Sequence, residues 1–132
     1  EPDFLAFDVA NRICYIIEVK DGDQFDTKKA SGEHATLHSF STDIANVIAY
    51  STKIYLCAFN ARTTDEIYHG LKGKFGKDQL LTGKQLCDLF KIDFDEINRI
   101  RSNDHQSNLD YFINAELEIP AIKNMVVKRL KS

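Results

Sequence analysis

The chain has 132 residues, of which 43% are hydrophobic, so it can form one globular domain with a single core, and a second domain is not expected. Its apolar runs are far shorter than the roughly 20 residues that cross a bilayer, and we expect a soluble, cytoplasmic protein with no membrane partner. The formal net charge of −3 argues weakly against a nucleic-acid binder, because phosphate contacts come from Lys and Arg.

Two runs rich in aromatic and β-branched residues, 3–9 and 13–20, predict the antiparallel strands of a tight hairpin. Loops of two or four residues make the paired residue numbers sum to about 21 or 23, so Asp3 faces Glu18 or Lys20. Residues two apart on a strand share a face, and directly opposed residues share it as well. We therefore expect the three side chains to converge at the open end of the hairpin, with Asp3 and Lys20 at a strand end and not in the core. A loop of three residues would place Asp3 on the wrong face.

Two carboxylates this close repel each other unless a cation lies between them, and Mg²⁺ accepts oxygen ligands at about 2.1 Å. The spacing predicts a Mg²⁺ site formed by Asp3, Glu18 and the backbone carbonyl of Val19, with Mn²⁺ able to substitute. Lys20 is placed to orient an attacking water and to offset the negative charge of a transition state. The competing interpretation is a strand end with solvated charges, in which Lys20 only pairs with Glu18.

The pair Pro2-Asp3 and the triplet Glu18-Val19-Lys20 resemble the motif of the PD-(D/E)xK nuclease superfamily, and the polar stretch that follows resembles type II restriction endonucleases. The resemblance implies a catalytic sheet flanked by helices, Mg²⁺-dependent hydrolysis of phosphodiester bonds in double-stranded DNA, and a homodimer. It assigns the catalytic roles to Asp3, Glu18 and Lys20. The family commonly has a helix ahead of the Pro-Asp strand, and we expect this chain to be a fragment that lacks such an N-terminal segment.

Downstream of the hairpin, Asp26 is the expected N-cap of a helix over residues 27–49, whose apolar residues recur at helical spacing. Residues 53–60 are predicted to form a buried strand. Because a helix separates it from the strand at 13–20, the two strands should be parallel neighbours.

The remainder of the chain is predicted to be helical. Three sequences resemble capping boxes and begin at Thr63, Thr82 and Asp93, and Pro120 fits the first turn of a final helix through Leu130. The expected fold is a restriction-endonuclease-like α/β/α core: a mixed central sheet with the catalytic hairpin, flanked by helices, and a helical C-terminal half. It forms a single nuclease domain over residues 1–132.

Four lysines are candidate contacts to the DNA backbone. Lys28 and Lys29 lie in the first turn of the helix after the catalytic strand, where exposed backbone amides favour phosphate. Lys72 and Lys74 lie among glycines in a loop. A solvated helix start and a plain surface loop are the competing interpretations.

Other polar residues are assigned to structure. His34 and His38 are four apart, with Glu33 beside them, but no HExxH pattern is present, which favours a structural or surface role. Asp8 is an odd number of residues from Asp3 and should lie on the opposite face of the hairpin. Three separated cysteines in apolar stretches predict reduced thiols in the core: Cys14, Cys57 and Cys87.

Two alternative functions are compatible with the same residues. The first is a junction resolvase or DNA-repair nuclease of the same superfamily, and the second is a catalytically inactive DNA-binding or dimerisation domain. Residues 1–70 contain six Lys or Arg and eleven Asp or Glu, whereas residues 71–132 contain eleven and nine. Acidic residues are thus concentrated around the predicted metal site, and the rest of the chain can still bind phosphate.

Overall fold

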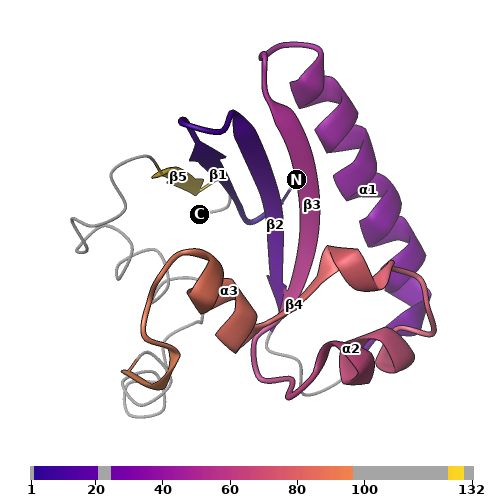
Figure 1. The fold of residues 1–132 in the computed structure, drawn as a ribbon. Coiled ribbons are helices and arrows are strands. Elements are labelled where there is room, and N and C mark those ends of the chain that lie inside the picture. Colours follow the sequence, from indigo (N-terminus) through magenta and orange to yellow (C-terminus); the bar gives the residue numbers. More distant parts are fainter. Residues whose placement is uncertain (1, 21–24, 97–124, 130–132) are drawn as a thin grey trace.

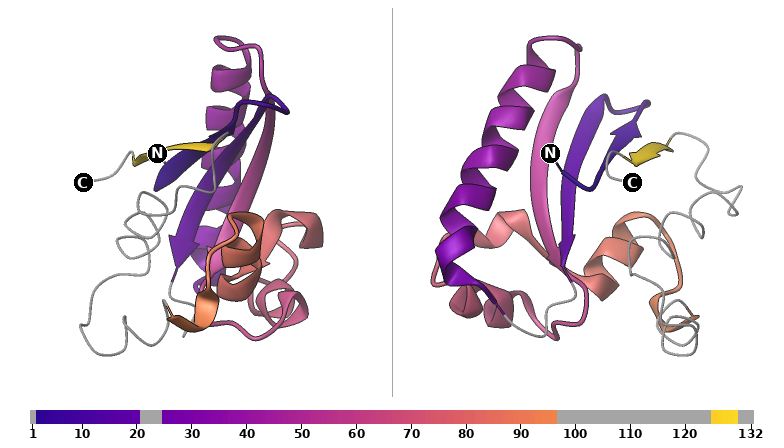
Figure 2. Two further views of the ribbon diagram at one scale, coloured as in Figure 1. Left: turned by 60° about the vertical axis from the view of Figure 1, so that its left-hand side comes forward. Right: turned by 180° about the vertical axis from the view of Figure 1, so that it is seen from behind.

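The computed structural model describes residues 2–20 and 25–96, and the backbone of residues 125–129. The strands in these residues form one mixed sheet of five, in the order β4-β3-β2-β1-β5. In chain order the elements are β1 (Phe4–Asp8), β2 (Ile13–Lys20), α1 (Thr27–Ala45), β3 (Ser51–Ala58), α2 (Thr64–Gly70), the 3₁₀ turn η1 (Lys77–Gln79), β4 (Leu80–Thr82), α3 (Gly83–Leu89) and β5 (Met125–Arg129). Figure 1 shows α1 running alongside β3, and Figure 2 shows β5 beside β1 at the edge of the sheet.

The predicted hairpin is confirmed. Phe4 pairs with Ile17 and Asp8 with Ile13, so the paired residue numbers sum to 21 and the loop has four residues. The predicted parallel strand is confirmed as well, because β3 pairs with β2 in parallel along its whole length. It lies at Ser51–Ala58, two residues earlier than residues 53–60.

Helices cover both faces of the sheet. One core cluster joins Phe4, Tyr15 and Ile17 to α3, and the other joins Leu5 and Ile16 to α1 and α2. The three cysteines are buried free thiols, as predicted. Within the described part of the chain, no helix combines the length and apolar character that crossing a membrane requires. The mixed sheet with helices on both faces confirms the mixed α/β architecture predicted from the sequence.

Local side-chain caps account for the helix starts. Asp26 accepts hydrogen bonds from the backbone N–H groups of Lys28 and Lys29 and begins α1 as predicted, but the helix ends at Ala45 rather than near residue 49. Thr63 caps α2 and Thr82 forms a reciprocal capping box with α3.

The third predicted cap is also present. Asp93 accepts bonds from the N–H groups of Asp95 and Glu96, and residues 94–96 are helical. Residues 97–124, which follow, lie outside the described residues.

The prediction of a wholly helical C-terminal half is wrong in two places. Residues 125–129 form β5, which pairs antiparallel with β1, instead of the last turns of a helix. Pro120, the expected start of that helix, lies outside the described residues. β4 was also missed, and it pairs in parallel with β3 over three residues. In both cases the segment is a strand because its backbone pairs with the open edge of a strand that is already in the sheet. Local sequence patterns do not show which edges are open.

Candidate active site

The hairpin register decides where the predicted acidic pair lies. Leu5 pairs with Ile16 and Phe4 with Ile17, and the same register continued by one residue places Asp3 opposite Glu18. Only 9% of Asp3 and 8% of Glu18 is exposed to solvent. The expectation that Asp3 lies outside the core is therefore wrong. Both carboxylates are part of the packed interior at the end of the hairpin.

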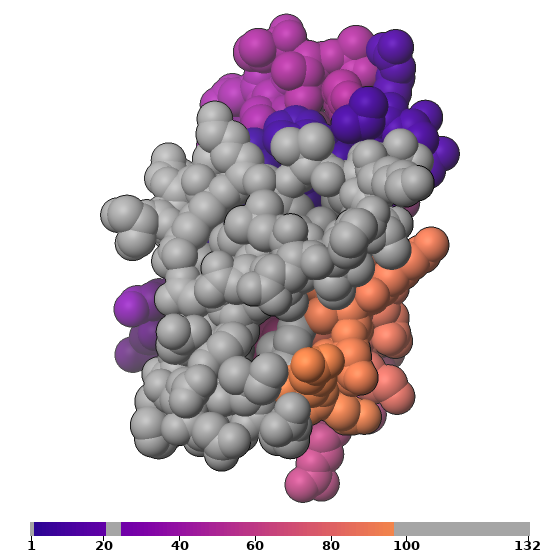
Figure 3. Space-filling model, turned by 90° about the vertical axis from the view of Figure 1, so that its left-hand side faces the viewer, coloured from indigo at the N-terminus to yellow at the C-terminus, as the bar shows by residue number. Residues whose placement is uncertain are grey.

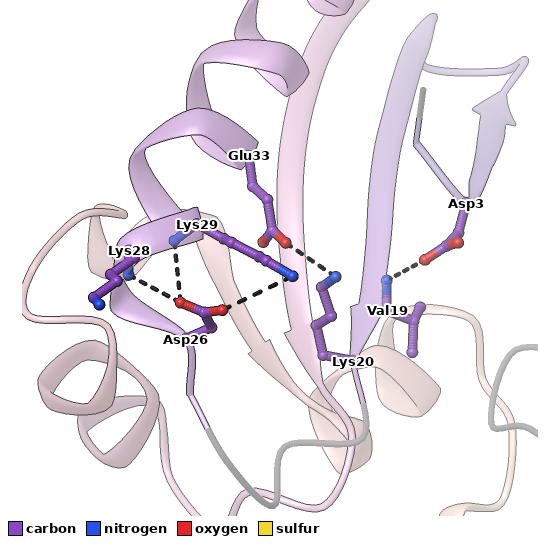
Figure 4. A network of polar contacts seen from close by, with 7 residues as sticks. All are labelled: Asp3, Val19, Lys20, Asp26, Lys28, Lys29 and Glu33. Carbon is purple, nitrogen blue, oxygen red and sulfur yellow. Dashed lines mark hydrogen bonds and ion pairs between the residues drawn. The ribbon is translucent and has the colours of Figure 1, made fainter.

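Asp3 is held by the backbone of the neighbouring strand. The N–H of Val19 donates a hydrogen bond of 2.7 Å to Oδ2 of Asp3, so this side chain continues the ladder where backbone pairing of the two strands stops (Figure 4). In an antiparallel pair the N–H and C=O of one residue point toward the same neighbouring strand. The carbonyl of Val19 therefore lies on the Asp3 side of β2, as the predicted metal ligand set requires.

The predicted residues share one face of the sheet. Cys14 and Ile16 of β2 and Leu5 of β1 pack in the core cluster beneath α1. Glu18 continues the β2 series and Asp3 the β1 series, and Lys20 follows Glu18 on the same side. The N–H of Phe59 donates to the carbonyl of Lys20 at 2.8 Å and fixes the end of β2 against the chain after β3.

Asp8 lies at the other end of the hairpin, on the face opposite Asp3, as predicted. Its carboxylate accepts bonds from the side chain of Asn11 at 2.8 Å and from the backbone N–H of Asn11 at 3.1 Å. These hydrogen bonds lower the pKa of Asp8 from its usual value. Asp8 therefore stabilises the turn of the hairpin. Figure 3 shows this turn at one end of the molecule, beside the connection between α1 and β3.

Lys20 makes a contact that sequence reasoning missed. Its Nζ lies 3.0 Å from Oε1 of Glu33 on α1, and the side chains are 48% and 26% exposed. The two residues point toward each other across the space between the sheet and the helix (Figure 4). The competing interpretation paired Lys20 with Glu18, whereas the ion pair observed here is with Glu33 on the helix.

A depression of about 440 Å³ opens between the end of β2 and the first turns of α1. Its lining residues come from both elements and are Glu18, Lys20, Lys29, Gly32, Glu33, Thr36 and Leu37. The depression joins one buried carboxylate, one partly buried carboxylate and two ammonium groups. Such a mixture of charges suits a ligand that carries both negative oxygens and a bound cation.

The donor set also fits the metal that the sequence predicts. Two carboxylates and a backbone carbonyl are hard oxygen ligands, which Mg²⁺ prefers, and it commonly keeps several water molecules as further ligands. Within residues 2–20 and 25–96, no group of three His, Cys, Asp or Glu side chains converges on one point. A cation here would therefore rely on Asp3, Glu18, backbone oxygen and water.

The four lysines predicted to contact DNA occupy two places. Lys29 lines the depression, with its Nζ 3.9 Å from Oδ2 of Asp26, while Lys28 is exposed on the same first turn. Lys72 and Lys74 are exposed on the loop after α2. Lys72 and Lys74 do not line the depression that contains Glu18.

The two histidines have structural contacts, in agreement with the sequence. A ring nitrogen of His34 lies 3.1 Å from the amide oxygen of Gln79, and its ring packs edge-on against buried Phe75 at 5.0 Å between centroids. The ring of His38 stacks against His34 at 6.4 Å. These contacts attach the loop after α2 to the first half of α1.

One similarity to a known protein bears on this site. The chain is 42% identical over 129 residues to the type II restriction enzyme HhaII of Haemophilus parahaemolyticus, an alignment that covers 97% of this chain. The chain spans 57% of that enzyme's length. No family model matches the sequence, and no solved structure matches the fold. The similarity agrees with the resemblance carried by the motif at the hairpin.

Proposed function

We propose that this chain carries the catalytic centre of a type II restriction-like endonuclease that cleaves double-stranded DNA with Mg²⁺, for which Mn²⁺ can substitute. The supporting observation is the hairpin register, which, continued by one residue, sets Asp3 opposite Glu18 at the end of the hairpin, where both side chains are buried. Lys20 follows on the same face of the strand. The 42% identity to a restriction enzyme supports the same reaction class.

Each residue has a distinct role in the proposed mechanism. Asp3, Glu18 and the carbonyl of Val19 would hold the cation. When bound, Mg²⁺ supplies Lewis acidity, which polarises a phosphoryl oxygen and lowers the pKa of a coordinated water. Lys20 orients the attacking water and offsets the charge that develops on the phosphoryl oxygens. The walls of the depression restrict how the phosphate can enter.

The proposed DNA contacts are electrostatic. Lys29 lies at the wall of the depression and Lys28 on the exposed side of the same turn, so both are assigned to phosphates next to the scissile bond. Lys72 and Lys74 are assigned to more distant phosphates. Two copies of the protein would cut both strands, so a homodimer belongs to the proposal.

Cleavage of phage DNA tests the function directly. The protein is incubated with phage DNA and Mg²⁺, with EDTA as the control. Discrete bands that require the cation are expected. Lys20→Ala should lower the cleavage rate by about 10²–10³, the typical loss when one preorganised charge stabiliser is removed. Cleavage at the wild-type rate by Lys20→Ala would remove its assigned role.

Metal binding is measured separately from cleavage. Mg²⁺, Mn²⁺ and Ca²⁺ should each raise the melting temperature of the wild-type protein in proportion to the logarithm of the ion concentration above its Kd. If no ion stabilises the protein and none binds near Asp3, the catalytic proposal is abandoned in favour of a DNA-binding or dimerisation role. Cutting restricted to branched DNA would instead favour a junction resolvase.

A further inference from the structure

The position of Glu33 on α1 is unusual for a charged residue. Ala30, Glu33 and Leu37 are spaced by three and four residues, and therefore lie on one stripe of the helix. Ala30 and Leu37 are the buried residues of this helix, with 0% and 1% exposure, and they pack on the sheet. Glu33 thus interrupts the apolar stripe and directs a carboxylate to the end of β2.

The contact made by that carboxylate is with the proposed catalytic lysine. Oε1 of Glu33 lies 3.0 Å from Nζ of Lys20, and both residues line the depression that Glu18 also lines. A lysine side chain has four rotatable bonds and, when half exposed, samples many rotamers. A partner on a rigid helix restricts that sampling to the rotamers that place the ammonium in the depression.

A surface ion pair without function is the competing explanation, since exposed pairs contribute little to stability. Two observations favour a functional role. Glu33 occupies a helix position whose neighbours on the stripe are buried, and it is itself only partly exposed. Its partner is the lysine that the proposed reaction requires, at the end of a strand whose backbone is fixed by the bond from Phe59 to Lys20.

We propose that Glu33 is a positioning residue that holds the ammonium of Lys20 beside Glu18 before DNA arrives. This inference rests on the proposed nuclease function. Glu33 contacts Lys20 and acts through it. Removing Glu33 should therefore reduce the rate of the chemical step and leave the affinity for DNA nearly unchanged.

The first experiment is single-turnover cleavage of DNA by the Glu33→Ala variant. The rate constant should fall roughly 10-fold, the order expected when rotamer freedom is restored to one lysine side chain, while the Kd for DNA changes less than about 2-fold. Glu33→Gln retains an oxygen acceptor and should recover a large part of the lost rate. Asp43→Ala removes an exposed carboxylate from the same helix and should behave as wild type.

A double-mutant cycle separates positioning from a general structural effect. In a Lys20→Ala background, Glu33→Ala should cause no further loss of rate, because there is no ammonium left to position. Additive losses would overturn the inference, as would a wild-type rate for Glu33→Ala. If Glu33→Ala fails to fold, Glu33→Gln is used in the cycle instead. The inference is then overturned if Glu33→Gln lowers the rate by the same factor in the wild-type background and in the Lys20→Ala background.

Three outcomes have distinct meanings. A weaker effect of Mg²⁺ on the melting temperature of both Glu33 variants would make Glu33 a metal ligand and overturn the positioning role. Absence of cleavage by the wild-type protein would refute the proposed function and with it the inference. Normal wild-type cleavage with an unaffected Glu33→Ala refutes the inference alone.

Discussion

The bond between Asp3 and Val19 yields a quantitative prediction. Asp3→Ala leaves the N–H of Val19 without the acceptor that now lies at 2.7 Å, at a site where Asp3 is only 9% exposed. An unsatisfied buried donor costs about 1–3 kcal/mol. Relief of the repulsion with Glu18 offsets part of this cost in the metal-free protein. We expect a net loss of about 1–2 kcal/mol in the free energy of unfolding.

Asp3→Asn is the matched control, because its amide oxygen can still accept the bond from Val19 while the charge is removed. Its metal-free stability should lie within about 1 kcal/mol of wild type, since a weaker hydrogen bond is balanced by reduced repulsion. Both variants should be inactive, and neither should be stabilised by Mg²⁺. The comparison thus separates the structural role of Asp3 from its proposed role as a metal ligand.

Urea unfolding in the presence of EDTA measures the free energy of unfolding of the wild type, Asp3→Ala and Asp3→Asn under identical conditions. A loss of 1–2 kcal/mol corresponds to a fall of roughly 3–10 °C in melting temperature for a chain of this size. If Asp3→Ala is as stable as wild type, the bond to Val19 does not support the end of the hairpin. If Asp3→Asn is destabilised as much as Asp3→Ala, charge rather than acceptor geometry is responsible. Either result would refute the reasoning.

Two stability predictions concern other parts of the molecule. Burial raises the pKa of Cys14 from 9.0 to about 11 and that of Cys87 to about 12. Because the thiols ionise at lower pH in the unfolded chain, their contribution to stability is complete below pH 9 and is lost as the pH rises to those values. The urea midpoint of the wild-type protein should therefore fall between pH 9 and pH 11, and it should fall less steeply in Cys14→Ala. Equal slopes for the two proteins would contradict this. Gly83→Ala should destabilise the protein, since its Cβ would overlap the backbone oxygen of Phe59, whereas Gly32→Ala, with no atom within 4 Å, should stabilise α1 by about 0.5–1 kcal/mol. Thermal melting of both glycine variants checks this pair, and a stable Gly83→Ala would show that the helix can shift away from the strand end.

The start of α1 was predictable because it depends on neighbours in sequence. The side chain of Asp26 reaches backbone donors two and three residues away, so the residue type and its place before an apolar repeat identify it. The end of the helix was predicted four residues too far. The apolar side chain of Ile48 packs against the core from the turn after Ala45, so helical spacing of apolar residues continued beyond the helix.

The edges of the sheet were not predictable in the same way. β4 is three residues long, too short for an alternating pattern, and it is a strand because β3 offers an edge to pair with. β5 lies more than a hundred residues from its partner β1. Pairing over such distances depends on which edges remain open after the rest of the chain has folded.

By itself the sequence determined the position of the acidic pair. Loop parity and strand alternation are local geometry, and they are enough to place Asp3 opposite Glu18 or Lys20, with all three on the same face. The register of the hairpin then selects Glu18. Only the tertiary structure decided that both carboxylates are buried and that Glu33 meets Lys20. The ion pair depends on how α1 packs across the sheet, and both features arise because burial and the contact partners of a long side chain are set by elements that are distant in sequence.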